Sequence, residues 1–441
     1  MIRARRTLAT AAVLVIGTLA FGRAQALVTP AFDADAGPRE RKLPDGAVVA
    51  SSFDDLVRLV GDANGPHTIG LRAGTYRGDL VIQRPVALVG ERGATLEGTG
   101  GGTVITIETN DVSVENLAIR HSGRRSTTED AGIKAKGERI RIVDVRVDDT
   151  LFGVTLQACH WCDLERVRVE GTLDNAELRG DGIKLWESND SIVRGCVVDH
   201  ARDVVVWYTR RALVEGNVVR HGRYGTHFMY AHDSVARGNR IEDDVVGIFC
   251  MYSMRLTIED NVLAGARGAA GMGIGFKESD AVQVRGNWFV ANTTGVYLDF
   301  SPRTPEQPLV FEGNVFALND VALRLHSVEK GAIFHGNDFR ENDATIEVDG
   351  GGDALACDVR GNHFSDYEGY DLNGDGIGDV PHRVSALSSE LADEHPALKF
   401  FHGTTAMHLV DAVAHAVPVL ESRVLLEDKA PLVRSPEVAQ P

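Results

Sequence analysis

A short motif that recurs eight times between Val193 and Phe364 constrains the fold most. The copies read VRGCVV, VEGNVV, ARGNRI, IEDNVL, VRGNWF, FEGNVF, FHGNDF and VRGNHF, and their Asn-type position falls at residues 196, 217, 239, 261, 287, 314, 337 and 362. Weaker copies upstream place Asn116, Asp144 and Arg166 in the same column. A unit of this length cannot bury its own apolar face, so neighbouring copies must stack into a solenoid.

The repeats favour strands over helices. Between residues 65 and 365 apolar and polar residues alternate, β-branched residues are common, and no 3.6-residue period occurs. Leucine-rich repeats share a period near 22 residues, but their Leu-x-x-Leu-x-Leu signature is absent. We therefore predict an all-β fold: a right-handed single-stranded parallel β-helix of short PbH1-type repeats, with a partly helical C-terminal tail. The Asn column fits turns, because Asn tolerates left-handed geometry and can hydrogen-bond along the stack.

The chain divides into five predicted segments. Residues 1–26 combine arginines, an apolar run and the cleavage site Ala24-Gln25-Ala26, which indicates a secretory signal peptide and a soluble, exported mature chain. Residues 27–64 form an N-terminal segment with a capping helix at 52–60, because an open rung would expose unpaired backbone. The β-helix follows at 65–368, an acidic DxNxDGxxD loop at 369–384, and a helical cap and tail at 385–441, with an apolar helical pattern at 406–420.

Charge and cysteine content limit the partners. The formal net charge is −17, and removing the four arginines of residues 1–26, which contain no acid, lowers it by four to −21. Such an acidic surface argues against nucleic acid and anionic lipid as partners. Five cysteines allow at most two disulfides and leave one thiol over.

Several longer motifs resemble the NosD family. They are GDGIKLWESNDSIVRG, YGTHFMYAHDS, GIFCMYSMRL and the loop DYEGYDLNGDGIGD, followed by an apolar tail that ends in KAPLV. The resemblance covers nearly the whole mature chain. It implies a periplasmic β-helix protein that helps to mature the copper centres of nitrous oxide reductase.

The resemblance also implies partners. Proteins of this family dock on an ABC transporter made of a permease and an ATPase, and they work with a lipid-anchored copper chaperone to deliver copper to the reductase. On this interpretation ATP hydrolysis belongs to the transporter, the chain itself is not an enzyme, and it contacts the membrane only through the transporter.

The rung alignment places soft metal ligands on one outer face. In GIKLW, Ile183 and Leu185 are expected to face the core, while Lys184 and Trp186 face out. Two adjacent outer columns follow: Trp186, Trp207, Met229 and Met251, and beside them Lys184, Val205, His227 and Phe249. Neighbouring rungs lie ~4.8 Å apart, so thioethers and an imidazole, which suit Cu(I), come together at His227, Met229 and Met251. Three interpretations stay open: packing beneath a loop or the tail, a partner surface, and a copper site.

Tyr208, Tyr230 and Tyr252 form the next column, which we interpret as a structural aromatic stack.

The pair Cys159 and Cys162 brackets a turn and has several possible uses. A CxxC in an exported protein can be a disulfide, a redox pair or a soft metal site. The absence of a thioredoxin-like context disfavours the redox use, and a structural disulfide and a copper site stay open. Cys196, in the Asn column, and Cys250, at an inward position, are expected to be structural.

The acidic loop resembles half of a calcium loop. Asp371, Asn373, Asp375 and Asp379 fall at loop positions 1, 3, 5 and 9, but position 12 is His382 instead of Glu. The loop either binds calcium, docks on a partner, or forms a bare turn.

The rival interpretation is a carbohydrate-active β-helix enzyme, an alginate epimerase or a polysaccharide lyase. Such enzymes need a cation for the uronate carboxylate, a base and an acid. The residues that could supply these groups are Lys184, His227, Tyr230, His232, Asp233 and Arg255. A strongly acidic protein is a poor host for a polyanion, which disfavours this interpretation.

Overall fold

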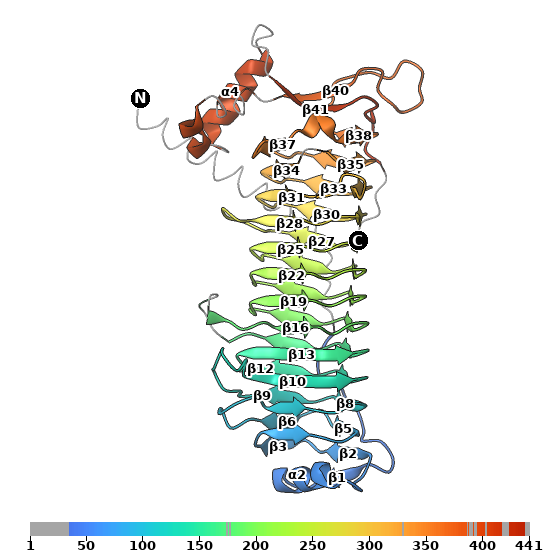
Figure 1. Ribbon diagram of the computed structural model, residues 1–441, viewed down its shortest axis with the longest axis vertical. Helices are drawn as coiled ribbons and strands as arrows, with labels where there is room; N and C mark the ends of the chain where they lie inside the picture. Colours follow the sequence, from blue (N-terminus) through green and yellow to red (C-terminus); the bar gives the residue numbers. More distant parts are fainter. Residues whose placement is uncertain are drawn as a thin grey trace, which may run out of the picture.

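The computed structural model describes residues 35–436 except 173–174, 176–177, 329, 386, 388–390, 392–394, 402–403 and 417–422. The chain winds into a parallel β-solenoid of about 14 turns, which confirms the predicted β-helix (Figure 1). The predicted signal peptide at 1–26 lies outside the described residues. Among the residues that are described, no helix has the length and apolar character needed to cross a membrane.

Each turn gives one strand to each of three parallel sheets. The first sheet has 14 described strands. In order they are β1 (Val48–Ala50), β2 (Thr68–Leu71), β5 (Val86–Gly90), β8 (Val112–Glu115), β11 (Arg141–Val143), β14 (Asp163–Glu165), β17 (Ile192–Arg194), β20 (Leu213–Glu215), β23 (Val235–Arg237), β26 (Thr257–Glu259), β29 (Val282–Arg285), β32 (Leu309–Glu312), β35 (Ala332–His335) and β38 (Asp358–Arg360).

The second sheet carries the outer columns described above and has 12 described strands. They are β4 (Leu80–Ile82), β7 (Ile105–Ile107), β10 (Ala131–Glu138), β13 (Phe152–His160), β16 (Ile183–Trp186), β19 (Asp203–Trp207), β22 (Tyr224–Met229), β25 (Val246–Met251), β28 (Met272–Lys277), β31 (Thr294–Asp299), β34 (Val321–His326) and β37 (Ala344–Asp349).

The third sheet has 13 described strands and completes each turn. They are β3 (Gly74–Arg77), β6 (Ala94–Glu97), β9 (Ala118–Arg120), β12 (Arg146–Asp148), β15 (Arg168–Glu170), β18 (Val197–Asp199), β21 (Val218–Arg220), β24 (Arg240–Glu242), β27 (Val262–Ala264), β30 (Trp288–Val290), β33 (Val315–Ala317), β36 (Asp338–Arg340) and β39 (His363–Phe364).

The predicted Asn column forms a hydrogen-bonded ladder inside the solenoid. From Asn217 to Asn362 each side-chain Nδ2 donates to the Oδ1 of the next Asn at 2.9–3.0 Å. Cys196 begins the ladder, and its backbone N–H donates to Asn217 Oδ1 at 2.8 Å. Identical residues thus satisfy one another's buried polar groups on each of these rungs, which is what burial requires of amides. This chain of side chains, 217, 239, 261, 287, 314, 337 and 362, is called the Asn ladder below. The prediction is wrong for Asn116, Asp144 and Arg166, because the strand register places these three residues in the column of Gly195, one residue before that of Cys196.

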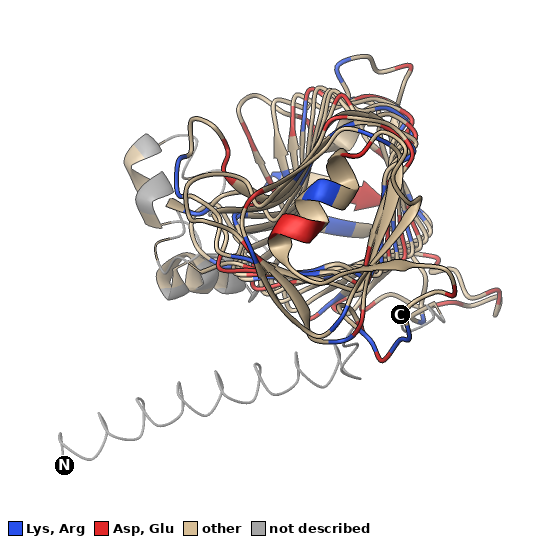
Figure 2. Cartoon of the chain, turned by 90° about the horizontal axis from the view of Figure 1, so that it is seen from below, with Lys and Arg blue, Asp and Glu red and all other residues tan. Residues whose placement is uncertain are grey.

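A helix closes the N-terminal end of the solenoid. Helix α2 (Phe53–Gly61) begins after Ser52, whose hydroxyl accepts the Asp55 N–H. Its apolar side, with Leu56, Leu59 and Val60, is buried against the first rungs. Figure 2 shows α2 lying across the triangular opening of the solenoid. The helix predicted at 52–60 corresponds to α2.

The solenoid begins earlier than predicted. Strand β1 lies inside the predicted N-terminal segment 27–64 and pairs in parallel with β2. A strand of three residues is too short to show alternation in the sequence.

Strands close the C-terminal end, which the sequence did not indicate. The 3₁₀ turn η2 (Ala354–Ala356) lies beside β38, and β40 (His382–Ser385) pairs antiparallel with β41 (Val424–Asp428). Asp428 in β41 is fully buried and accepts the Nδ2 and backbone N–H of Asn362, both at 2.9 Å. A carboxylate therefore ends the Asn ladder, where an eighth Asn would leave its own donors unpaired.

The predicted helix at 406–420 corresponds to α4 (Thr405–Ala416), which follows the 3₁₀ helix η3 (Pro396–Phe401). Residues 417–420 lie outside the described residues. Helix α4 projects to one side of the solenoid (Figure 1). The predicted helical cap is therefore wrong in part, because the strand pair β40–β41 covers the last rung.

Candidate functional site

The outer columns of the second sheet have the predicted register. Trp186, Trp207, Met229 and Met251 are paired in turn through β16, β19, β22 and β25. The adjacent column pairs Lys184, Val205, His227 and Phe249, and continues to Gly275 in β28. A Cβ at Gly275 would lie only 2.8 Å from the Phe249 ring, so this glycine leaves the space that Phe249 occupies.

His227 makes close contacts with residues of both neighbouring rungs. Trp207 Nε1–H donates to His227 Nδ1 at 3.2 Å, and His227 Nε2 lies 3.3 Å from Met251 Sδ. The rings of Trp207 and Tyr224 meet the imidazole edge-on, and the Phe249 ring lies parallel to it. These rings leave His227 only 5% exposed.

Burial keeps the His227 imidazole neutral. It lowers the pKa of His227 to about 4, because the charged form would lose its hydration. Since Nδ1 accepts the Trp207 N–H, the proton of the neutral ring sits on Nε2 and points at the Met251 sulfur. The site is therefore an imidazole and a thioether in direct contact, with the second thioether, Met229, next to Met251 in register.

The two outer columns are less exposed than the sequence suggested. Trp186, Trp207, Met229 and Met251 are half-buried, whereas Val205 and His227 are buried. Lys184 is also buried, because its Nζ pairs with Glu129 Oε1 at 2.5 Å and lies over the Trp186 ring. The prediction of an exposed stripe is wrong for the Lys184 column, since large rings of adjacent columns and the segment containing Glu129 cover it.

The neighbouring tyrosine column is a stack, as predicted. The ring centroids of Tyr208 and Tyr230 are 5.1 Å apart, those of Tyr230 and Tyr252 are 5.0 Å apart, and both pairs are nearly parallel. Tyr208 and Tyr230 are exposed at their outer edges. Together with Trp186 they form an aromatic surface that borders the two methionines.

The cysteines do not supply free thiolates to this face. Cys159 and Cys162 are joined in a disulfide, and both are completely buried at the corner between β13 and β14. Of the two uses left open, the structure has the disulfide, and in this form the pair has no thiolate for copper. Cys196 and Cys250 are buried inside the solenoid, where burial raises the pKa of both thiols. Their structural interpretation fits this position.

The acidic loop uses its side chains to hold its own backbone. Asp371 accepts the N–H groups of Gly374 and Gly376, and these bonds lower the pKa of its carboxyl. Asp379 accepts the Leu372 N–H, and Asp375 accepts the Ile377 N–H and an Asn373 amide N–H. Each carboxylate keeps further lone pairs, so these bonds neither require nor exclude a calcium ion, and the calcium site stays a prediction.

One group of metal-ligating side chains was missed from the sequence. Across residues 35–436, with the gaps given above, Asp199, His200 and His221 are the one set of three or more His, Cys, Asp or Glu residues whose ligand atoms gather within 4.8 Å. The sequence signal was present, because His200 and His221 fall at the same place in successive repeats.

The groups that a carbohydrate-active enzyme would need are engaged elsewhere. Arg255 pairs with Asp233 at 2.5 Å, and this hydrogen bond holds the pKa of the Asp233 carboxyl below its usual value. His232 Nδ1 accepts the Met254 N–H, and Tyr230 lies within the tyrosine stack. These residues are not assembled around an open base, acid and cation.

Known proteins resemble this chain over most of its length. The family described as "Periplasmic copper-binding protein (NosD)" matches residues 165–369. A relative from Pseudomonas aeruginosa, named "Probable ABC transporter binding protein NosD", is 31% identical over 85% of this chain and 90% of its own length. The chain belongs to the NosD family. A relative of the same name from Stutzerimonas stutzeri is 26% identical, over 83% of this chain and 86% of its own length.

Solved structures share the fold at low sequence identity. The A-module of the mannuronan C-5 epimerase AlgE6 from Azotobacter vinelandii covers 67% of this chain with a TM-score of 0.53 and 14% identity. The catalytic unit of a GH87 α-1,3-glucanase from Streptomyces thermodiastaticus covers 72% with a TM-score of 0.52 and 14% identity. These similarities extend to the β-helix alone. The NosD relatives, in contrast, are named as binding proteins.

Proposed function

We propose that this chain is the periplasmic copper-handling partner of an ABC transporter and takes part in maturing the copper centres of nitrous oxide reductase, receiving or delivering copper without being an enzyme. The observation that carries the proposal is the contact between His227 Nε2 and Met251 Sδ, with Met229 next in register. A NosD family described as copper-binding and relatives named for ABC transporters support it.

The donor set fits Cu(I) as cargo. Thioether sulfur and neutral imidazole are soft or borderline ligands without charge, which a monovalent soft cation accepts in a half-buried site. His227 has one lone pair, and Trp207 now takes it at Nδ1. Binding through Nε2 therefore requires the proton to move to Nδ1 and Trp207 to release its hydrogen bond. Trp207 is half-buried and ends β19 at the rim of the site.

The C-terminal end of the molecule is suited to docking on the transporter. The loop at 369–384 carries apolar side chains at its tip, including Leu372, which is 82% exposed. Helix α4 places Leu409 and Val413, one turn apart, on an exposed face, with Leu409 64% exposed. Apolar side chains held out on projecting elements are typical of a protein interface. The ATPase activity belongs to the transporter, and a copper chaperone would meet the aromatic surface beside Met229 and Met251.

Copper binding tests the site. We expect the mature protein to bind one Cu(I) under reducing conditions, measured by competition with a chromogenic Cu(I) chelator. Replacing both methionines, Met229→Leu with Met251→Leu, should lower the affinity at least 100-fold while the melting curve stays within a few degrees, because Leu conserves the volume. Unchanged affinity in the double variant would refute the assignment.

Docking is tested separately. We expect Leu409→Asp to reduce co-purification with the transporter and to leave the melting curve unchanged, because the side chain is exposed. Val245→Asp is the matched control, since Val245 is also an exposed apolar residue but lies on the side of the solenoid. Equal co-purification of both variants would exclude α4 from the interface.

A further inference from the structure

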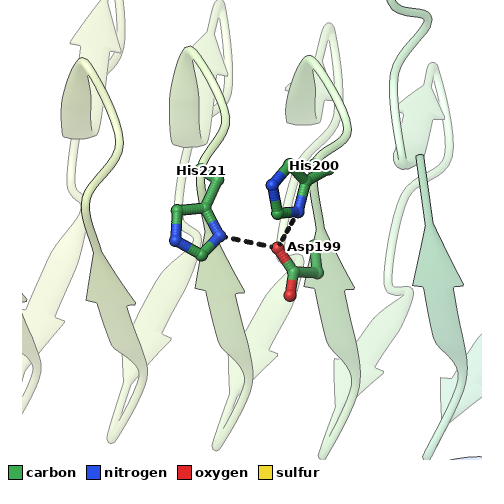
Figure 3. A group of neighbouring side chains, drawn as sticks. All are labelled: Asp199, His200 and His221. Carbon is green, nitrogen blue, oxygen red and sulfur yellow. Dashed lines mark hydrogen bonds and ion pairs between the residues drawn. The ribbon is translucent and has the colours of Figure 1, made fainter. Parts of the chain in front are cut away.

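The corner between the third and second sheets brings two histidines into adjacent rungs. Asp199 ends β18 and is followed by His200, whereas His221 follows β21. Because β18 and β21 pair with Asp199 opposite Arg220, His200 and His221 occupy the same place in successive turns. Both have a positive φ, 55° and 57°, so the two turns carry their side chains in the same direction (Figure 3).

Three ligand atoms converge at this corner. His200 Nδ1 lies 2.6 Å and His221 Nδ1 lies 2.8 Å from the same oxygen, Asp199 Oδ1. The two imidazole centroids are 4.5 Å apart. Figure 3 shows both rings directing one nitrogen at Asp199 and holding the other nitrogen away from it. All three side chains are partly open to solvent, so an ion can reach them.

The arrangement differs from the other His–carboxylate contacts of the solenoid. His121 with Asp149, His326 with Asp349, His335 with Asp358 and His363 with Asp338 each place a single imidazole on a carboxylate. One imidazole is enough for such an ion pair. A second imidazole on the same oxygen brings two like charges together when both rings are protonated, which is unfavourable. When both rings are neutral, however, it completes a set of two nitrogens and one oxygen.

We propose that Asp199, His200 and His221 bind a divalent transition-metal ion of the borderline class, Zn²⁺ or Cu²⁺. Imidazole and carboxylate are the ligands these ions prefer, and three protein ligands leave a coordination position open to water. With bonds of about 2.0–2.1 Å, the ligand atoms must move to about 3.3 Å apart, which exposed side chains on turns allow. Each neutral ring then carries its proton on Nε2, so binding transfers no electrons and requires only a change of tautomer.

This site is distinct from the proposed Cu(I) site in chemistry and position. It has no sulfur ligand and lies before β19 and β22, whereas Met229 ends β22 and Met251 ends β25. The proposal therefore does not depend on the proposed function.

Zinc titration of the untagged mature protein tests the proposal. We expect one Zn²⁺ per chain by isothermal titration calorimetry after chelator treatment. His200→Gln and His221→Gln should each lower the affinity at least tenfold, since each removes one of three ligands. His121→Gln is the matched control, because it breaks a His–Asp contact at the same corner of another rung. Its Zn²⁺ affinity should equal that of the unaltered protein.

Two further readouts separate a metal site from a structural one. Saturating Zn²⁺ should raise the melting temperature of the unaltered protein and of His121→Gln, but not of His221→Gln, because only a folded site binds the ion. With Cu²⁺ as probe, pulsed EPR should detect two imidazole nitrogens. The absence of Zn²⁺ binding, equal affinity in His221→Gln, or an equal loss in His121→Gln would overturn the proposal.

Discussion

Two columns of the solenoid are built by the same stacking of successive rungs, but one has a structural role and the other carries local chemistry. The Asn ladder repeats one residue on successive rungs inside the solenoid, and each amide satisfies its neighbour. On the outer face of the second sheet, one column changes from Trp186 and Trp207 to Met229 and Met251. Repetition makes the first column a structural element that seven successive rungs share. Variation gives the second column a local chemistry on two rungs only.

The difference shows in how the polar groups are satisfied. Asn287 Oδ1 accepts both the backbone N–H and the Nδ2 of Asn261, and its own Nδ2 donates onward. His227 has instead one hydrogen bond from Trp207 and one contact to sulfur, a weak acceptor. A fully satisfied network resists change, whereas a weakly satisfied imidazole can exchange its partners for a metal ion.

Breaking the ladder should have the largest effect. We expect Asn287→Ala to lower the free energy of unfolding by about 3–5 kcal/mol, because it leaves the buried backbone N–H of Asn261 without an acceptor and removes the donor to Ile258 O and Asn314 Oδ1. Urea denaturation measures this, with Met229→Leu as the matched change in the outer column, expected to cost less than about 1.5 kcal/mol. Similar losses in both variants would remove the distinction between the columns.

Acid should act on the outer face of the second sheet through His227, which lies in the column next to Met229 and Met251. Its pKa in the folded protein is about 4, below the ordinary value of 6.5, so the unfolded chain binds more protons between these values. The contribution of His227 to the free energy of unfolding is therefore present in full above pH 6.5 and decreases as the pH falls towards 4. Between pH 7 and pH 5 it decreases by about 2 kcal/mol.

The measurement for His227 is a difference between two proteins. His227→Gln should lack this part of the pH dependence when its urea denaturation is compared with that of the unaltered chain. Burial raises the pKa of Asp244 to about 8, so the folded state binds more protons at this carboxyl than the unfolded chain does. Asp244 therefore increases the free energy of unfolding as the pH falls, which is opposite to the effect of His227. It acts in both proteins and cancels in the difference. Parallel pH profiles would contradict the burial of His227.

The smallest expected effect concerns Trp207. Replacing it, Trp207→Phe, removes the hydrogen bond that occupies His227 Nδ1, so Cu(I) affinity should rise about three- to tenfold, the equivalent of one net hydrogen bond of ~0.5–1.5 kcal/mol. Trp186→Phe is the control, since Trp186 lies in the same column and contacts Trp207 but not the imidazole. Equal affinities in the two variants would show that Trp207 does not compete with copper.

The β-helix, the register of Met229 with Met251 and the Asn column from residue 196 to residue 362 could be predicted from the sequence, whereas Asn116, Asp144 and Arg166 were placed one residue out of register. Each depends on residues one rung apart, and the rung length follows from the repeat. The strand cap could not be predicted, because β41 begins 39 residues after the end of β40 (from 385 to 424) and pairs with it across the C-terminal tail. Pairing at such separation leaves no local periodic signal.

For this protein the sequence by itself determined which residues share a column wherever the repeated motif is complete, since strand alternation and that motif fix how neighbouring rungs align. Only the tertiary structure decided what covers them. Trp207, Tyr224 and Phe249 surround His227, Glu129 reaches Lys184, Cys159 and Cys162 are joined and buried, and Asp199 meets His200 and His221. These contacts depend on side-chain rotamers and on segments packed from other rungs, which the repeat pattern does not specify.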